Sequence, residues 1–256
     1  MSYDPIQRHL AIEKLVTRLG PEGQEKKYYR FRPARWYGGI VTADCAGCGL
    51  LCRFCWVRDA VMLRPADTGS FYTPRQVADN LTALARKFGF SQLRVSGGEP
   101  TIGKAHLLQL LDLLKNNGLS FILETNGIPL GYDEDYARKL ARYDFVHARV
   151  SLKGCNEQEF SILTGASPEG FKLQLSSLKN LIEAGAKCHP SVMISFSKKE
   201  DFLDLMGKLE QIDSNLAAQV EIEELILYPH VLKRIQRCGL HHISGHEPDK
   251  VPKKQV

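Results

Sequence analysis

The sequence predicts an α/β fold: a partial, TIM-like (β/α)6 barrel of parallel strands, with an N-terminal helix and a C-terminal tail. Short apolar segments alternate with amphipathic segments of ten or more residues, which is the pattern of strands joined by crossover helices. Six such strands are predicted, fewer than the eight of a closed barrel. No Pro/Gly/Ser-rich linker divides the 256 residues, so one core domain is expected.

Residues 1–38 are expected to form a helix and a connector. Apolar residues recur with helical spacing from Ile6 to Leu19, and Gly20 and Pro21 end the helix. The run from Lys26 to Arg35 is rich in Lys, Arg and Tyr and predicts a basic connector. We interpret it as solvated surface, with an anionic substrate or an acidic protein partner as the alternative.

The core domain is expected over residues 39–240. Its predicted strands are 39–43, 92–96, 120–125, 145–152, 187–196 and 220–227. The predicted helices between them are 73–88, 104–116, 134–143, 169–184 and 199–212, and Thr73 and Pro74 are typical of a helix start. Residues 241–256 contain Gly245, Pro248 and Pro252 and predict a tail that is flexible or draped on the surface.

Composition and charge favour a cytoplasmic protein without a membrane partner. No apolar run approaches the roughly 20 residues of a membrane span. The first ten residues include Asp4, Arg8 and His9, where a signal peptide would be apolar. A net charge of +5 does not by itself indicate nucleic-acid binding, which is a disfavoured alternative.

A cluster of cysteines is the strongest functional signal. Cys48, Cys52 and Cys55 form a C-x3-C-x2-C array directly after the first core strand. In a chain of this type, clustered thiols indicate metal ligands rather than disulfides. Three thiolates from one loop can bind three irons of a [4Fe–4S] cubane and leave the fourth iron open to a cofactor. A zinc site with a distant fourth ligand is the alternative.

This array resembles the signature of the radical S-adenosylmethionine (radical SAM) superfamily. Phe54 stands where the family has an aromatic residue, and the resemblance implies that it lies against the adenine of S-adenosylmethionine. The family also has a GGE-type motif after its second strand, here Ser96, Gly97, Gly98 and Glu99. The resemblance implies that this segment binds the methionine part of the cofactor, and glycines allow such close backbone approach.

Two further segments resemble the glycyl-radical-enzyme activating enzymes, and the first also resembles 7-carboxy-7-deazaguanine synthase. In the first segment, Glu124 and Asn126 are implied to lie near the methionine or ribose of the cofactor. In the second, Ser151 is a cofactor-binding candidate and Lys153 is implied to neutralise a carboxylate or the substrate. Ser151 departs from the acid of activating enzymes, so no second metal is expected. A Glu124–Lys153 salt bridge is the alternative to both functional roles.

The remaining candidates are weaker. His189 and Ser191 on the fifth strand are implied to contact the ribose, with a structural role as the alternative for His189. Cys155 follows the fourth strand, where a thiol could donate a hydrogen atom to a product radical. Cys45 is expected to be a buried spectator thiol.

The resemblance implies reductive cleavage of S-adenosylmethionine to a 5′-deoxyadenosyl radical that abstracts a substrate hydrogen, with electrons from a donor such as flavodoxin or ferredoxin. Three functions follow as hypotheses. The first is an enzyme that modifies or activates a protein, and the second is a small-molecule or nucleobase enzyme of cofactor biosynthesis. The third is a non-catalytic iron–sulfur or zinc-binding module.

Overall fold

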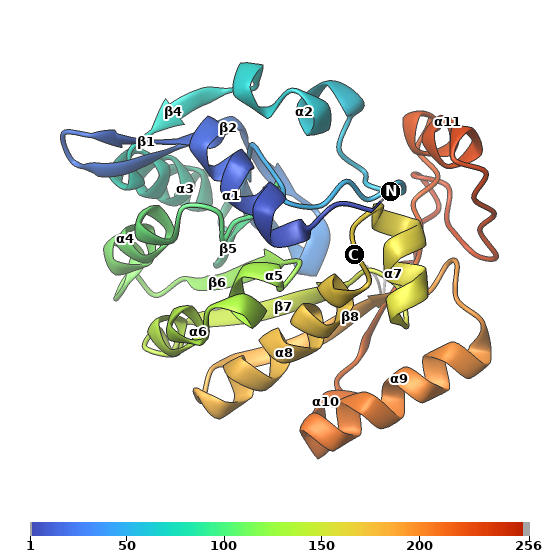
Figure 1. Cartoon of the computed structure of the whole chain (residues 1–256). Coiled ribbons are helices and arrows are strands. Elements are labelled where there is room, and N and C mark those ends of the chain that lie inside the picture. Colours follow the sequence, from blue (N-terminus) through green and yellow to red (C-terminus); the bar gives the residue numbers. More distant parts are fainter. Residues whose placement is uncertain (1, 253–256) are drawn as a thin grey trace.

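A nine-stranded mixed sheet organises residues 2–252, the part of the chain that this computed structural model describes (Figure 1). Six strands are parallel and follow one another in the sheet: β3 (Ile40–Cys45), β5 (Gln92–Gly97), β6 (Ser120–Thr125), β7 (Val146–Leu152), β8 (Lys187–Met193) and β9 (Glu221–Glu223). They correspond to the six predicted core strands. The strand order is linear and does not close, so the prediction of a partial barrel is confirmed.

Helices cover one face of this sheet, and each predicted crossover helix is present. The predicted ones are α3 (Pro74–Phe88), α4 (Lys104–Leu114), α6 (Glu134–Leu140), α8 (Glu169–Glu183) and α9 (Lys199–Ile212). The other helices of this part of the chain are α2 (Asp59–Leu63), α5 (Ile128–Tyr132), α7 (Glu157–Thr164) and α10 (Ser214–Ala218). Helix α3 begins at a capping box, in which Thr73 and Gln76 each accept a hydrogen bond from the backbone of the other.

The segment predicted as a basic connector contains two strands. Helix α1 (Pro5–Val16) is followed by β1 (Thr17–Gly20) and β2 (Gly23–Ala34), which pair as an antiparallel hairpin. Strand β2 also pairs antiparallel with β3 and with the short strand β4 (Ser70–Tyr72). The hairpin therefore extends the parallel sheet beyond its first strand.

The two faces of the sheet differ in chemistry. Every second residue of β3 to β8 is apolar and packs with the helices in one hydrophobic core, as Val95, Leu123 and Val150 do. The opposite face, called the inner face below, is polar on almost every strand. Its members are Arg30 and Arg32 on β2, Thr42 and Asp44 on β3, Arg94 and Ser96 on β5, Glu124 on β6, Arg149 and Ser151 on β7, His189 and Ser191 on β8, and Glu221 and Glu223 on β9. A face that is so rich in ionisable groups is not an ordinary core.

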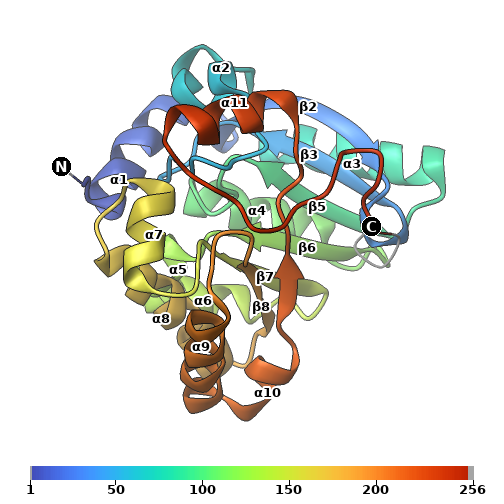
Figure 2. The same cartoon turned by 90° about the vertical axis from the view of Figure 1, so that its right-hand side faces the viewer.

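The C-terminal segment crosses the open side of the sheet. After α11 (Pro229–Arg237), His246 forms a bridge with Ile226 beyond β9, and its ring hydrogen-bonds Glu224. Arg35, just after β2, then donates to the carbonyl of Pro248 (3.1 Å), so the segment joins the two sides of the sheet (Figure 2). The predicted tail is thus draped on the protein over residues 241–252, and residues 253–256 lie outside the described residues.

None of the helices described between residues 2 and 252 is long and apolar enough to span a bilayer.

Candidate functional site

The three predicted cluster ligands lie together in the loop that follows β3, at the carboxyl end of the parallel strands. The Cys48 Sγ accepts hydrogen bonds from the Leu50 amide (3.4 Å) and the Asn126 Nδ2 (3.6 Å). Burial raises the pKa of the Cys48, Cys52 and Cys55 thiols, that of Cys52 to about 12. Bound iron would offset this penalty because a cation favours the thiolate.

The donor set fits an iron–sulfur cubane. Among residues 2–252, no three His, Cys, Asp or Glu side chains meet at one point as the ligands of a single metal ion would. A cubane does not require such convergence, since each thiolate binds a different iron. The donated N–H groups at the Cys48 sulfur are also of the kind that tunes cluster potentials.

The glycine-rich loop after β5 is joined directly to the cysteine loop. The Gly98 amide donates to the carbonyl of Cys45 (2.8 Å), and the Glu99 amide donates to the carbonyl of Gly47 (2.7 Å). A Cβ on Gly98 would lie 2.2 Å from the Gly47 carbonyl oxygen, so only glycine fits there. Gly97 has a φ of +86°, which also favours glycine. The two motifs thus form one structural unit.

The carboxylate of Glu99 fixes this loop from within. Its Oε1 accepts hydrogen bonds from the amide and hydroxyl of Thr101 and from the hydroxyl of Thr125, and its Oε2 accepts from the amide of Asn126. The side chain is buried, with 2% exposed. Glu99 therefore ties the ends of β5 and β6 together, whereas the sequence motif implied contact with the cofactor.

A buried lysine also holds this loop, through hydrogen bonds to its backbone carbonyls. The Lys26 ammonium donates to the carbonyls of Glu99 (2.9 Å), Pro100 (2.9 Å) and Ile102 (2.8 Å), and the residue is 1% exposed. The sequence-based interpretation of Lys26 as solvated surface or as part of an anion-binding run is wrong. The sequence did not reveal this role because the three carbonyls lie more than seventy positions away.

The loops after β6 and β7 are joined by a residue that the sequence reading missed. The side-chain amide of Gln174 on α8 donates to the carbonyls of Asn126 (2.6 Å) and Ser151 (2.9 Å) and accepts from the Lys153 amide (3.1 Å). Gln174 is fully buried. Asn126, Ser151 and Lys153, which were predicted from separate motifs, are thereby brought to the same edge of the sheet as the cysteines.

Glu124 is the centre of one half of the inner face. It accepts hydrogen bonds from Arg94 (2.7 Å), the Ser96 hydroxyl (2.9 Å) and the Tyr37 hydroxyl (2.9 Å). Although burial opposes ionisation, the two arginines Arg94 and Arg149 lower the pKa of Glu124. The alternative of a Glu124–Lys153 salt bridge is wrong, because Glu124 pairs with Arg94.

Arg149 is the centre of the other half. Its guanidinium donates to Glu221 through Nε (2.8 Å) and Nη2 (2.7 Å), and Nη2 also reaches Glu223 (2.8 Å). Ser151 donates to Glu223 (2.9 Å), and the Lys153 ammonium hydrogen-bonds the Ser151 hydroxyl. A continuous row of hydrogen bonds thus leads from β9 to Lys153. Burial raises the pKa of Cys52, and the positive charge of Lys153 offsets part of that rise because it favours the thiolate.

The two predicted residues of β8 differ in their surroundings. His189 lies between His147 (2.7 Å) and Glu221 (3.0 Å). Although burial opposes ionisation, hydrogen bonds from Arg149 and His189 lower the pKa of Glu221 to about 2. Its carboxylate therefore accepts the hydrogen bond, and the Nε2 of His189 donates it. Ser191 is buried, and its hydroxyl lacks a hydrogen-bond partner within the described residues. Contact of either residue with a ribose stays a prediction.

Three other predicted residues are buried. Phe54 packs against Phe196 at a ring-centroid distance of 5.7 Å, and its contact with adenine stays a prediction. The thiol of Cys155 is fully buried near Ser197, and burial raises its pKa to about 11. Donation of a hydrogen atom by Cys155 stays a prediction, and it would require access to that thiol. Cys45 is buried in the core, as expected for a spectator.

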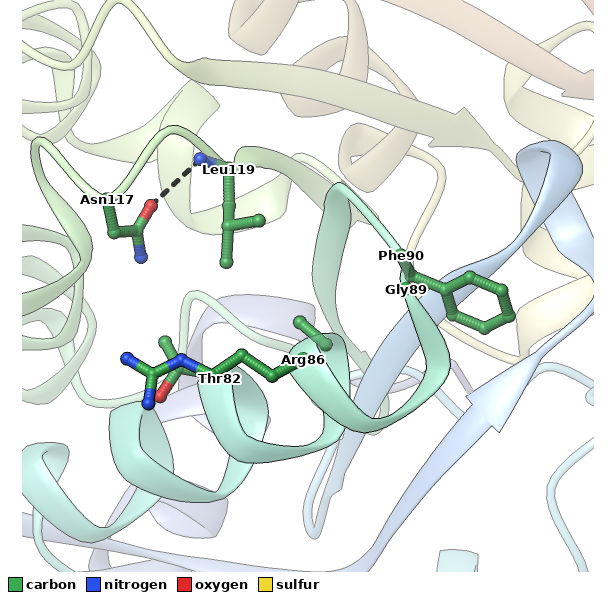
Figure 3. Close-up of a pocket in the computed structure, with 7 residues that line it drawn as sticks. Thr82, Arg86, Gly89, Phe90, Asn117 and Leu119 are labelled. Atoms are coloured by element: carbon green, nitrogen blue, oxygen red, sulfur yellow. Dashed lines mark hydrogen bonds between the residues drawn. The ribbon is translucent and has the colours of Figure 1, made fainter.

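A surface pocket of about 260 Å³ lies away from these groups (Figure 3). It is lined by Arg86 and Thr82 of α3 and by Asn117 and Leu119, which precede β6. These segments lead into the amino ends of their strands, whereas the cysteine loop follows a carboxyl end. Ligands of open α/β sheets bind at the carboxyl ends, so this pocket is not part of the candidate site.

Comparison with known proteins agrees with this geometry. The family model described as the radical SAM superfamily matches residues 44–209, which include the cysteine loop and four of the parallel strands that follow it. This chain belongs to the radical SAM superfamily. Radical SAM enzymes use a [4Fe–4S] cluster and S-adenosylmethionine, and the three thiols here fit that cluster. The hypothesis of a non-catalytic iron–sulfur or zinc-binding module is therefore wrong.

Curated relatives include a probable GTP 3′,8-cyclase of Methanosarcina acetivorans, which is 28% identical over 66% of this chain and 49% of that protein. The GTP 3′,8-cyclase of Peptoclostridium acidaminophilum is 30% identical over 46% of this chain and 34% of that protein. This chain thus spans about half or less of the length of these curated relatives.

Solved structures show the same fold at low sequence identity. Streptococcus suis SuiB bound to the precursor peptide SuiA has a TM-score of 0.56 at 16% identity, over 78% of this chain and 46% of that one. The AdoMet-bound enzyme anSMEcpe has a TM-score of 0.54 at 14% identity, over 71% of this chain and 49% of that one. At this level of identity, the likeness shows a shared fold and nothing further.

Proposed function

We propose that this radical SAM enzyme acts on a small, charged molecule of the nucleotide kind. The observation that carries the proposal is the inner face, where ionic side chains lie on neighbouring strands of the sheet whose carboxyl edge carries the cysteine loop. A ligand with both anionic and hydrogen-bonding groups suits such a surface. The expectation of a protein substrate is not confirmed, and the cyclase relatives favour the small-molecule alternative.

The distribution of charge on the inner face favours one orientation of the bound ligand. At the β2 side, Arg30 and Arg32 share the single carboxylate of Asp44, which leaves one excess positive charge. At the β9 side, Glu221 and Glu223 share Arg149, and Glu221 is partly exposed. A phosphate or carboxylate would bind at the arginine side, and donor groups of a heterocycle would face the glutamates.

The chemistry follows from the family. When bound, the reduced cluster supplies the electron that cleaves S-adenosylmethionine to a 5′-deoxyadenosyl radical, which abstracts a hydrogen atom from the substrate. Cys48, Cys52 and Cys55 would hold the cluster, and the loop fixed by Glu99 and Lys26 would hold the methionine part of the cofactor. We infer a cytoplasmic one-electron donor such as flavodoxin or ferredoxin as the partner. The cyclisation named for the relatives is not carried over, because this chain covers so little of them.

Transfer of a labelled hydrogen tests the proposal. The anaerobically reconstituted enzyme is mixed with dithionite, S-adenosylmethionine and GTP that carries deuterium on the ribose, with ribose-deuterated ATP and GMP run in parallel. We expect 5′-deoxyadenosine to form faster with at least one nucleotide and to contain deuterium. Cys52→Ala should abolish both signals. A panel of nucleotides that neither accelerates turnover nor transfers deuterium would refute a nucleotide-like substrate.

A matched pair of variants tests the arginine side. Arg32→Met should raise KM for the active nucleotide roughly tenfold to a hundredfold, the value of one or two charge-assisted hydrogen bonds. Cleavage of S-adenosylmethionine without substrate should be unchanged. Arg86→Met removes an exposed arginine from the pocket of Figure 3 and serves as the control. Equal KM values in the two variants would remove Arg32 from the substrate site.

A further inference from the structure

Helix α11 holds the segment that follows the third cysteine. The guanidinium of Arg234 donates to the carbonyl of Cys55, to the carbonyl of Val57 (2.7 Å) and, through Nε, to the carboxylate of Asp59 (2.7 Å). Arg234 is 5% exposed. The Arg234 side chain therefore hydrogen-bonds two backbone carbonyls and one carboxylate in the five-residue stretch from Cys55 to Asp59.

Two neighbours on the same helix complete the attachment. The Nε2 of His230 lies 2.7 Å from the carbonyl of Trp56 and must donate, since a carbonyl only accepts. Arg237 donates to the second oxygen of Asp59 (2.8 Å). The carbonyls of three consecutive residues beginning at Cys55 thus all point to α11. In Figure 2 this helix lies beside α2, which begins at Asp59.

The charge of Arg234 is as important as its contacts. Three thiolates make the cysteine site negative, and each electron that enters a cluster adds negative charge there. A buried guanidinium beside the third ligand favours the reduced form, because electrostatic interactions are stronger away from water. Asp59 offsets part of this charge, but it is 38% exposed on its side chain, whereas Arg234 is 6% exposed.

We propose that Arg234 is a positioning residue that fixes Cys55 in the cluster-binding loop and makes one-electron reduction of the cluster easier. The residue lies outside residues 44–209, the part that matches the family model. The inference depends on the cluster and not on the substrate, so its failure would leave the proposed nucleotide substrate untouched.

Redox titration of the reconstituted cluster, followed by electron paramagnetic resonance, is the main test. Arg234→Met should make reduction about tenfold less favourable, a shift of the midpoint potential of about 59 mV to more negative values. Arg234→Lys keeps the charge but cannot reach both carbonyls, so its potential should stay near that of the natural protein. Its cluster should nevertheless lose iron to a chelator several-fold faster.

Two further variants control the test. Arg237→Met removes an exposed cation from the same helix and should change the potential little. Asp59→Asn leaves Arg234 charged without its carboxylate, so the potential should move in the opposite direction, and this variant carries the test if Arg234→Met does not fold. A shift in the same direction for Asp59→Asn and Arg234→Met would refute the electrostatic role. Unchanged potential and chelator resistance in Arg234→Met would refute the whole proposal.

Discussion

Replacement of Lys26 by methionine should lower stability by several kcal/mol. The substitution keeps a long side chain but removes the donors to three buried carbonyls of the loop from Glu99 to Ile102. A buried polar group left without its partner costs about 1–3 kcal/mol. The Glu99 carbonyl keeps a hydrogen bond from the Ile102 amide (3.3 Å), so the loss comes mainly from the carbonyls of Pro100 and Ile102. Two such carbonyls would cost about 2–6 kcal/mol, and methionine recovers some of this because no ammonium is buried. We therefore expect a net loss of about 2–4 kcal/mol.

Urea unfolding of the metal-free chain, followed by circular dichroism, measures this loss. The midpoint should fall while the slope with urea stays unchanged. Lys27→Met is the matched control: the Lys27 ammonium donates to the carbonyl of Ala66 at an exposed position and lies over the Phe71 ring, and a loss below about 1 kcal/mol is expected. Binding of S-adenosylmethionine to the reconstituted Lys26→Met variant should also weaken. If Lys26→Met loses less than about 1 kcal/mol, or no more than Lys27→Met, the buried ammonium does not support the loop.

Three further predictions follow from buried groups. Burial lowers the pKa of His106 to about 3. Between about pH 6 and 3 this histidine is protonated in the unfolded chain but not in the folded one, so the free energy of unfolding should fall by roughly 1.4 kcal/mol for each unit that the pH is lowered. His106→Gln should flatten that slope in urea titrations at several pH values, and an unchanged slope would assign it to other groups. Gly98→Ala should abolish calorimetric binding of S-adenosylmethionine because of its 2.2 Å clash, whereas Gly207→Ala meets nothing within 4 Å and should bind normally. Gln174→Leu leaves two buried carbonyls unpaired and should lower stability by about 2–4 kcal/mol; a melting temperature equal to that of the natural protein would contradict this.

The sequence was informative where local pattern decides the structure. The six parallel strands were predicted because their apolar residues face the helices, and the residues at their carboxyl ends were placed near one another by topology alone. Cys48, Asn126 and Lys153 are an example, since a hydrogen bond joins the first two and Gln174 joins the last two.

The N-terminal hairpin shows why other parts could not be predicted. The paired residues of Lys26-Lys27-Tyr28-Tyr29 break the polar-to-apolar alternation of a half-buried strand, and the structure has a register shift between Tyr28 and Arg30. The segment therefore resembles a basic connector in sequence, although β2 places Arg30 and Arg32 on the inner face. The pairs Arg94–Glu124 and Arg149–Glu221 were missed for a related reason. Their partners are thirty and seventy-two positions apart, and sequence spacing gives no measure of such contacts. Polar residues at every second position of an otherwise apolar strand, with an arginine among them as at Arg94 and Arg149, are the signal that would have revealed them.

The docking of α11 has a consequence for the time at which the protein matures. Arg234 follows Cys55 by 179 residues, so at about 5–20 residues per second a ribosome reaches it roughly 10–35 s after the last cysteine. Throughout that interval the nascent thiols lack the helix that later holds their loop. Metal delivered during translation would meet an unsupported segment, whereas metal delivered to the finished polypeptide would meet a preformed one. The order of residues along the chain therefore favours iron–sulfur assembly after α11 has been synthesised.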